Sequence, residues 1–262
     1  MNGFSIILGD TLEELKKLSD SSVDLVVTSP PYPGVCNMWG DLYKPENFNE
    51  AHKFLNQIWD ECLRVLNPGG KLCINIANTK RRPYLPNTFK IYQWAENKCE
   101  ALGEIIWNKG YGQCGTAWGS YCNPSDMSLA DQHEYILVFR KYGERKKQSG
   151  YYLNPFDFKS WRNSLWNIPP VQASKTGHVA AFPLEIPKRL ILLYSYPNEV
   201  VLDPFMGSGS TGVAAKQWDR SFIGIDHNIK YTDLAINKIQ NTIQQDLYFK
   251  EKCDIIKQGK LI

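Results

Sequence analysis

The sequence has no Cys-x-x-Cys pair, although it contains seven cysteines in 262 residues. An odd number of widely spaced cysteines is typical neither of a zinc ribbon nor of a disulfide framework, and it favours reduced thiols in a cytoplasmic protein. A His-Glu-x-x-His zinc motif is also missing, because residue 137, four positions after His133, is leucine. We therefore expect no metal site.

Long hydrophobic runs and a leader segment are missing as well. No stretch approaches the ~18 apolar residues of a membrane span, and "MNGFSIILGD" has no basic start. The net charge is only +3, so an acidic partner would have to meet a local basic patch. A composition with 43% hydrophobic and 22% charged residues is typical of a folded globular protein.

Short β-rich segments alternate with amphipathic ones, which predicts an α/β fold with a mostly parallel sheet. Helices are predicted at "DTLEELKKL", capped by Asp10 or Thr11, and at "NFNEAHKFLNQIWDECLRVLNPGG", which would stop at Pro68-Gly69-Gly70. Strands are predicted over 4–8, 23–28, 71–77, 104–107, 134–139, 200–202 and 222–225.

The segment from about 141 to 174 differs from the rest of the chain. It begins with a basic run, "RKYGERKKQ", and is then crowded with aromatic residues and prolines that show no clear periodicity. We predict a small inserted lobe that carries a binding surface, between residues 1–140 and 175–262. Trp118, Trp161 and Trp166 are either recognition residues or core.

The strand at 23–28 runs directly into Ser29-Pro30-Pro31-Tyr32. Two prolines end a strand at once, because neither can donate a backbone N–H. Taken alone, this corner is either a rigid loop that closes the strand or a site at which fixed acceptor groups meet a ligand.

A second distinctive stretch is "VVLDPFMGSGSTGVAAKQWDRSFIGID", in which three glycines follow a short strand and precede a helix. Such a turn lets backbone N–H groups approach a ligand, and Asp226, at the end of the next strand, can accept from ribose hydroxyls. The stretch therefore predicts a ribose-containing cofactor. It also fits the dinucleotide pattern, but the few residues after Asp226 could not complete the usual sheet of an NAD enzyme. A purely structural glycine turn is the other alternative.

These stretches, together with "LGDTLEEL", "RVLNPGGKLCIN", "HEYILVFRK" and "GHVAAFPLEIPKRLI", resemble the β-class amino-methyltransferases of DNA, in order and over nearly the whole chain. The resemblance implies a Rossmann-like methyltransferase fold with a circularly permuted, seven-stranded sheet and helices on both faces. It implies S-adenosyl-L-methionine as cofactor, and it makes 141–174 the target-recognition region.

The resemblance also implies how the corner works. The target base is flipped out of the duplex, Ser29 Oγ and the Pro30 carbonyl accept from its exocyclic amine, and Tyr32 stacks on its ring. In this family a leading serine goes mostly with N4 of cytosine, so cytosine is favoured over N6 of adenine. The implied setting is restriction–modification, with a companion nuclease. The rival class is a non-catalytic nucleic-acid-binding module, and the chain could act as a monomer or a homodimer.

Three groups of site residues follow from this interpretation. The catalytic group is Ser29, Pro30, Pro31 and Tyr32. The cofactor-binding group is Asp10, Thr28, His178, Phe182, Asp203, Phe205, Gly207, Gly209, Ser210, Thr211 and Asp226, although Asp10 also fits a helix cap, Phe205 a core residue and His178 an ordinary loop. The DNA-binding group is Arg140, Lys141, Arg145, Lys146, Lys147 and Arg162.

Overall fold

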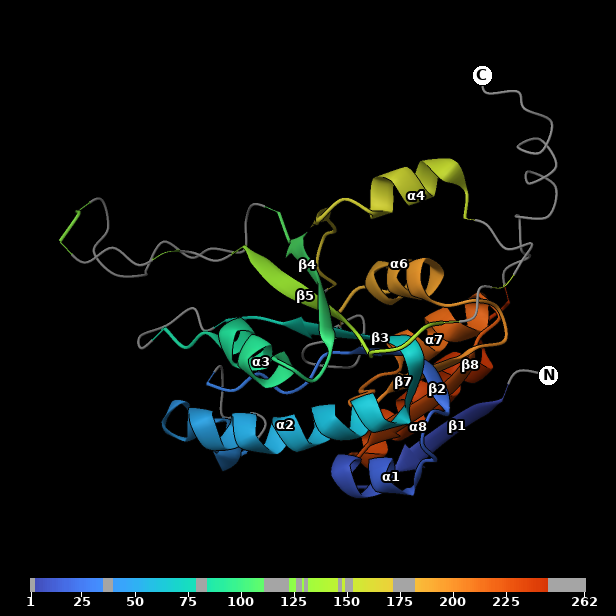
Figure 1. Ribbon diagram of the computed structural model, residues 1–262, viewed down its shortest axis with the longest axis horizontal. Helices are drawn as coiled ribbons and strands as arrows, with labels where there is room; N and C mark the ends of the chain where they lie inside the picture. Colours follow the sequence, from blue (N-terminus) through green and yellow to red (C-terminus); the bar gives the residue numbers. More distant parts are fainter. Residues whose placement is uncertain are drawn as a thin grey trace.

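A single twisted sheet runs through the middle of the molecule and is covered by helices on both faces (Figure 1). The computed structural model describes residues 3–34, 40–78, 84–110, 123–125, 129, 132–145, 148, 153–171 and 182–244. Trp118, Lys146, Lys147 and His178 lie outside these residues, so their predicted roles stay predictions.

The sheet has eight strands in the order β1-β8-β7-β2-β3-β5-β4-β6. Their bounds are β1 Phe4–Leu8, β2 Val23–Thr28, β3 Leu66–Ile76, β4 Glu100–Asn108, β5 His133–Arg140, β6 Leu165–Asn167, β7 Val200–Asp203 and β8 Ser221–Asp226. Of these strands only β5 is antiparallel to its neighbours. The pair β8-β7 from the C-terminal half lies between β1 and β2 from the N-terminal half, as expected for a permuted chain.

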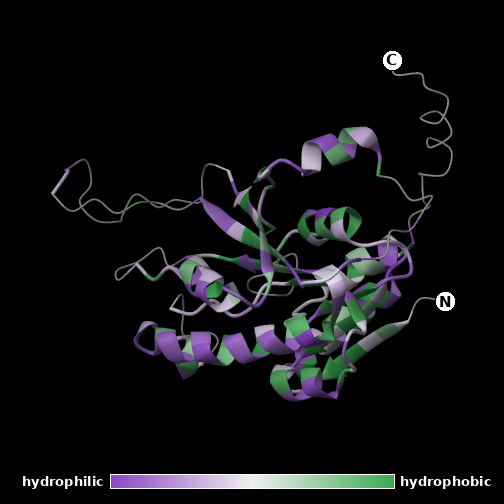
Figure 2. Cartoon of the chain, in the orientation of Figure 1, coloured by the Kyte–Doolittle hydropathy of each residue, from purple (hydrophilic) through white to green (hydrophobic). Residues whose placement is uncertain are grey.

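Six of the helices that the structure describes cover the two faces of the sheet, three on each face. One face holds α1 (Thr11–Lys17), α2 (Phe48–Val65) and α3 (Asn87–Ala95), and the other holds α6 (Glu185–Tyr194), α7 (Ser210–Gln217) and α8 (Ile229–Gln240). Two 3₁₀ turns, η2 (Asp41–Tyr43) and η3 (Pro45–Asn47), precede α2. Much of the α2 surface turned to the viewer is hydrophilic (Figure 2).

Strand alternation explains why both faces can be covered. On β2, Val26 packs into the core under α1–α3, while its neighbours Leu25 and Val27 pack under α6–α8. A strand buried on both faces is a continuous apolar run in sequence, as residues 25–27 are. Of the helices that the structure describes, none is long and apolar enough to cross a membrane.

The predicted seven-stranded sheet is corrected to eight by β6. This strand comes from the segment predicted to be a separate lobe, and it pairs with β4 through Ile106 and Leu165. Three residues are too few to show an alternating pattern, so the sequence predicts no strand there. Trp161 and Trp166 are both buried, and the Trp166 indole donates to the Trp161 carbonyl. These two tryptophans are core residues, and α4 (Pro155–Trp161) packs on α6.

A second correction concerns the stop at Pro68-Gly69-Gly70. Helix α2 ends at Val65 and β3 starts at Leu66, so the Pro-Gly-Gly segment lies inside the strand. The Gly69 N–H donates to the Lys141 carbonyl, and the Lys141 N–H donates to the Gly70 carbonyl. Pairing with the chain after β5 holds this segment in the sheet, although Gly69 is left-handed, with a φ of +74°.

Candidate active site

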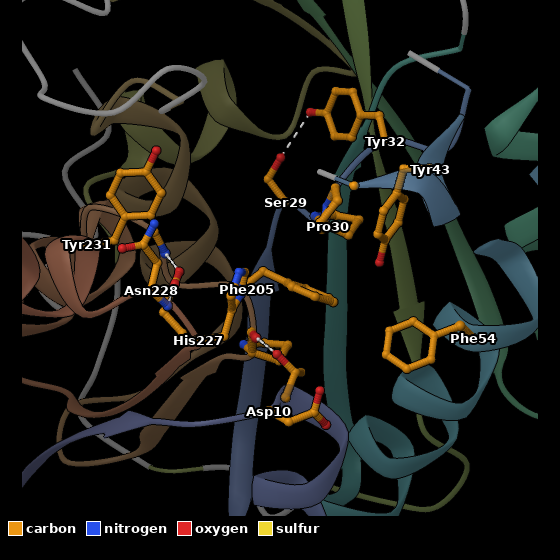
Figure 3. A pocket seen from close by; sticks show the side chains of 16 residues that line it. Asp10, Ser29, Pro30, Tyr32, Tyr43, Phe54, Phe205, His227, Asn228 and Tyr231 are labelled. Atoms are coloured by element: carbon orange, nitrogen blue, oxygen red, sulfur yellow. Dashed lines mark hydrogen bonds between the residues drawn. The ribbon is translucent and has the colours of Figure 1, made fainter. Parts of the chain in front are cut away.

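A cavity of about 570 Å³ lies where the parallel strands end, at their carboxyl edge. Corner residues after β2 form one wall, and residues that follow β1, β7 and β8 form the other (Figure 3). The lining residues are Asp10, Thr11, Ser29, Pro30, Pro31, Tyr32, Gly40, Tyr43, Phe54, Pro204, Phe205, Gly207, Asp226, His227, Asn228 and Tyr231. The two distinctive stretches of the sequence therefore meet in one cavity.

The proline corner is fixed from behind by an amide. Asn87, at the start of α3, is fully buried, and its Nδ2 donates to the carbonyls of Pro33 at 3.1 Å and Ala77 at 2.8 Å. Its Oδ1 is 2.8 Å from Nε2 of His52 on α2. Because the amide nitrogen already faces two carbonyls, Oδ1 accepts, and Nε2 of His52 carries the proton.

The polar groups of the corner meet below the cavity. The Tyr32 hydroxyl lies 2.9 Å from Ser29 Oγ and donates to Glu134 Oε2 at 2.8 Å. Asn75 Nδ2 lies 2.7 Å from both the Tyr32 hydroxyl and Glu134 Oε2. Lys109 forms an ion pair with the same carboxylate. Burial, together with the Glu134 carboxylate, raises the pKa of Tyr32 well above its ordinary value, so the phenol keeps its proton.

The glycine turn between β7 and α7 is held by Asp226. One oxygen of this carboxylate accepts from the Gly207 N–H at 2.9 Å and the other from the Asn228 N–H at 2.8 Å. The Gly207 N–H therefore reaches Asp226, although the sequence suggested that it would face a ligand. Gly207 and Asp226 both line the cavity. The carboxylate oxygens keep lone pairs with which Asp226 can accept ribose hydroxyls.

Gly209 lies beside the cavity lining and not within it. Its φ of +82° is left-handed, and a Cβ built there would come 2.8 Å from Cβ of Ala235 on α8. Glycine is required here by backbone conformation and by helix packing.

Asp203 joins three chain segments underneath the cavity. It is buried, and it accepts from the hydroxyls of Thr28 and Thr211, both at 2.7 Å, and from the Phe205 N–H at 3.1 Å. Burial raises its pKa to about 6. Thr28, Asp203 and Thr211 do not line the cavity, so the structure gives them a supporting position, and their predicted cofactor contact stays a prediction.

Asp10 both caps a helix and faces the cavity, the two alternatives that the sequence allowed. Its Oδ1 accepts from the N–H groups of Leu12 and Glu13, which caps α1, and its side chain also lines the cavity. Phe205 faces the same space and contacts Trp59 edge-to-face, with ring centroids 6.1 Å apart.

Several lining residues were not predicted from the sequence. Tyr43 and Phe54 approach the cavity from η2 and α2, and His227, Asn228 and Tyr231 approach it from the segment after β8 (Figure 3). Only Asn228 carried a signal, because asparagine directly before an amphipathic segment is a preferred helix cap, and it caps α8.

Three of the predicted DNA-binding residues are engaged within the protein. Arg140 pairs with Glu100, Lys141 Nζ donates to the Leu66 carbonyl at 2.6 Å, and Arg145 pairs with Glu199. Because Arg140 is the last residue of β5, which runs antiparallel to its neighbours, this group is at the other end of the sheet from the cavity. These contacts do not favour phosphate binding.

The remaining predicted residues have varied positions. Arg162 is exposed just after α4, with its guanidinium 5.9 Å from the Phe158 ring. Phe182 is buried in the core under α6–α8, and Ser210 is the first residue of α7. Neither lines the cavity. Among the described residues, no cluster of three or more His, Cys, Asp and Glu side chains could hold a metal ion.

Comparison with known families decides between the interpretations of this cavity. The model of the N6/N4 methyltransferase family, described as DNA methylase, matches residues 23–237 and so includes both the corner and the glycine turn. The chain belongs to this DNA methylase family. It is an S-adenosylmethionine-dependent DNA methyltransferase.

Two curated relatives of this methylase match it over most of their own length. The type II methyltransferase M.MjaI of Methanocaldococcus jannaschii is 34% identical, over 86% of this chain and 88% of its own. The DNA adenine methyltransferase YhdJ of Escherichia coli is 30% identical, over 90% of this chain and 82% of its own.

Solved structures agree with the fold. TTHA0409 of Thermus thermophilus, in complex with S-adenosyl-L-methionine, has a TM-score of 0.75 and 30% identity, covering 91% of this chain and 97% of its own. PvuII DNA methyltransferase, which is cytosine-N4-specific, has a TM-score of 0.72 over 98% of this chain and 92% of its own. At 17% identity this second match supports the fold alone.

Proposed function

We propose that this methylase transfers the methyl group to the exocyclic N4 amine of a cytosine that is flipped out of duplex DNA, as the modification enzyme of a restriction–modification system. The observation that carries the proposal is the single cavity in which Ser29-Pro30-Pro31-Tyr32 faces Asp10, Phe205, Gly207 and Asp226. The type II methyltransferases among its relatives support the restriction–modification setting.

The cavity fits S-adenosylmethionine on two grounds. Its volume of about 570 Å³ lies within the ~300–1,000 Å³ of small-molecule sites. It also has carboxylates at two strand ends, Asp10 and Asp226, to accept from the hydroxyl and amine groups of a nucleoside, and a Phe205 ring beside them. When bound, S-adenosylmethionine supplies an electrophilic methyl group on a sulfonium.

The corner would make the base amine a better nucleophile. The lone pair of this amine is delocalised into the ring, so the nitrogen needs acceptors that hold its N–H bonds and favour a tetrahedral geometry. Ser29 Oγ and the Pro30 carbonyl are suited to this role, because proline fixes the backbone before substrate arrives. Stacking on Tyr32 would contribute about 1–3 kcal/mol toward the cost of flipping.

N6 of adenine is the second candidate, and a specific observation favours it. YhdJ, a DNA adenine methyltransferase, is 30% identical over 90% of this chain. Ser29 at the head of the corner is the counter-argument, because the family pattern links serine with cytosine.

Nucleoside analysis decides between the two bases. Unmethylated duplex DNA is incubated with the protein and S-adenosylmethionine, digested, and examined by mass spectrometry. We expect N4-methylcytosine, at a short site that sequencing of the methylated positions identifies. N6-methyladenine alone would refute the cytosine assignment, and a Ser29→Ala variant as active as the wild type would refute the role of the corner.

A further inference from the structure

Three polar side chains below the corner come from three strands that are distant in the sequence. Asn75 is near the end of β3, Glu134 near the start of β5, and Lys109 directly follows β4. Each lies two residues from a buried apolar residue that faces α6–α8, namely Cys73, Ile136 and Trp107, so alternation turns all three polar side chains to that face. They meet Tyr32 there.

The donors and acceptors in this cluster can be assigned one after another. A carboxylate oxygen only accepts, so the Asn75 atom 2.7 Å from Glu134 Oε2 is the nitrogen, and it also donates to Tyr32. For the same reason the Tyr32 hydroxyl, 2.8 Å from that oxygen, donates its single proton to Glu134. Ser29 Oγ, 2.9 Å from the Tyr32 hydroxyl, must then be the donor of the pair they form.

We propose that the Glu134–Lys109 ion pair sets the direction of the Ser29 hydroxyl through Tyr32, so that Ser29 presents a lone pair and no proton to the target amine, while Asn75 Nδ2 lies 3.3 Å from the same oxygen. Glu134 and Lys109 are thus positioning residues, since they act through Tyr32 on a group that touches the substrate. This inference rests on the proposed role of Ser29 and applies to either base amine. A serine needs such a device because its hydroxyl can donate as well as accept.

The substitution Glu134→Gln should reverse the direction in which the Ser29 hydroxyl points. The amide oxygen would turn to the Lys109 ammonium, which only donates, and the amide nitrogen would then face Tyr32. Without an acceptor on that side, the Tyr32 proton turns to Ser29, whose own proton then points into the cavity. The N–H of the target amine would meet an O–H.

The first readout is the methyl-transfer rate. For Glu134→Gln we expect the single-turnover rate to fall about 10²-fold, the size of losing one preorganised hydrogen bond. Binding of S-adenosylmethionine, measured by calorimetry, should be unchanged. Glu199→Gln is the matched control, because the Glu134 and Glu199 side chains are 11% and 12% exposed and each pairs with one basic residue. We expect no loss of rate for Glu199→Gln.

The second readout is base preference in binding, which does not depend on turnover. The methylated site is prepared with its target amine replaced by a carbonyl, as uracil for cytosine or hypoxanthine for adenine. The wild type should prefer the amine, whereas Glu134→Gln should shift the ratio of the two dissociation constants about tenfold toward the carbonyl base, which accepts the Ser29 proton. An unchanged ratio would overturn the proposal.

Tyr32→Phe tests the same path if Glu134→Gln fails to fold. It keeps the ring and removes the hydroxyl that links Glu134 to Ser29, so we expect a loss of rate of similar size. Where Glu134→Gln does fold, we expect no further loss in the double variant. A wild-type rate for either variant, or losses that add in the double variant, would overturn the proposal. Absence of methyl transfer by the wild type would instead refute the proposed function.

Discussion

At the scale of single residues, most side chains at this site have a structural duty besides their proposed chemical one. Asp226 faces the cavity and also holds the Gly207 and Asn228 N–H groups. Asp10 faces it and caps α1. An alanine substitution at such a position removes both duties, so a conservative substitution is needed to tell them apart.

Substitutions of Asp10 can separate helix capping from cofactor binding. Asn is as good a helix cap as Asp, so Asp10→Asn should keep the thermal stability of the wild type while lowering affinity for S-adenosylmethionine about tenfold or more, through loss of a charged acceptor. Asp10→Ala should show the same loss of affinity and also lose about 1 kcal/mol of stability. Calorimetric titration and thermal denaturation measure the two effects. Wild-type affinity in Asp10→Asn would mean that Asp10 is a cap alone.

His52 makes a second residue-scale prediction, on acid stability. Burial lowers its pKa from an ordinary 6.5 to about 4, so the ring is neutral in the folded protein. Below pH 6.5 His52 binds a proton in the unfolded chain but not in the folded protein, so stability is lost as the pH falls toward 4 and below. The full loss is up to about 3 kcal/mol.

The test compares His52→Gln with the wild type by urea denaturation at pH 7 and at pH 4. The difference in unfolding free energy between the two pH values should be smaller in the variant, because Gln can still donate to Asn87 but does not titrate. Comparing the two proteins cancels the contributions of the other titrating groups to the pH dependence of stability. One of these groups is Asp203, whose raised pKa of about 6 makes the folded protein more stable as the pH falls. Equal acid sensitivity in both proteins would contradict the prediction.

At the scale of elements, the start of α7 is fixed by its contact with α8. The left-handed Gly209 caps α7, and its α-carbon lies so close to Ala235 that a side chain has no room. The turn that lines the cavity is therefore braced by a helix that contributes nothing to the catalytic corner.

Gly209→Ala and Gly110→Ala separate the two reasons for glycine. Gly110 has nearly the same φ, +83° against +82°, but a Cβ there would meet no atom of the described residues within 4 Å. Gly110→Ala should cost only the left-handed strain, about 1–2 kcal/mol. Gly209→Ala should lose a further 1–3 kcal/mol or so, because it overpacks the contact with α8. Equal losses of unfolding free energy in the two variants, measured by urea denaturation, would show that α8 shifts to make room for the added methyl group.

At the scale of the whole molecule, the strands and the two site segments could be predicted from sequence, because each has a local signature. All seven predicted strands are present, and the proline corner and the glycine turn do meet. The cluster of Asn75, Lys109 and Glu134 could not be predicted, because it depends on the register between β3, β5 and β4. In the sequence, His133-Glu134 has no local signature beyond an incomplete zinc motif.

The distribution of charge gives the whole-molecule prediction. With a net charge of only +3, DNA affinity must come from particular residues, and Arg162 is exposed while Arg145 is paired with Glu199. Arg162→Gln should reduce the slope of log affinity against log salt by about 1, and Arg145→Gln should leave it unchanged. Fluorescence anisotropy over a range of salt concentrations measures both slopes. A reduced slope in Arg145→Gln would mean that the Arg145–Glu199 pair opens on DNA.

The interleaving of β8-β7 between β1 and β2 also affects how this chain is made. In the parallel register Leu8 lies opposite Asp226, and Val26 lies opposite Leu202. At ribosomal rates of about 5–20 residues per second, β1 waits roughly 10–40 s for β8 to be synthesised. During that interval the nascent chain exposes open strand edges, which are templates for aggregation. Slow translation or loss of holdase chaperones should therefore lower the soluble yield of this protein before any effect on its finished fold.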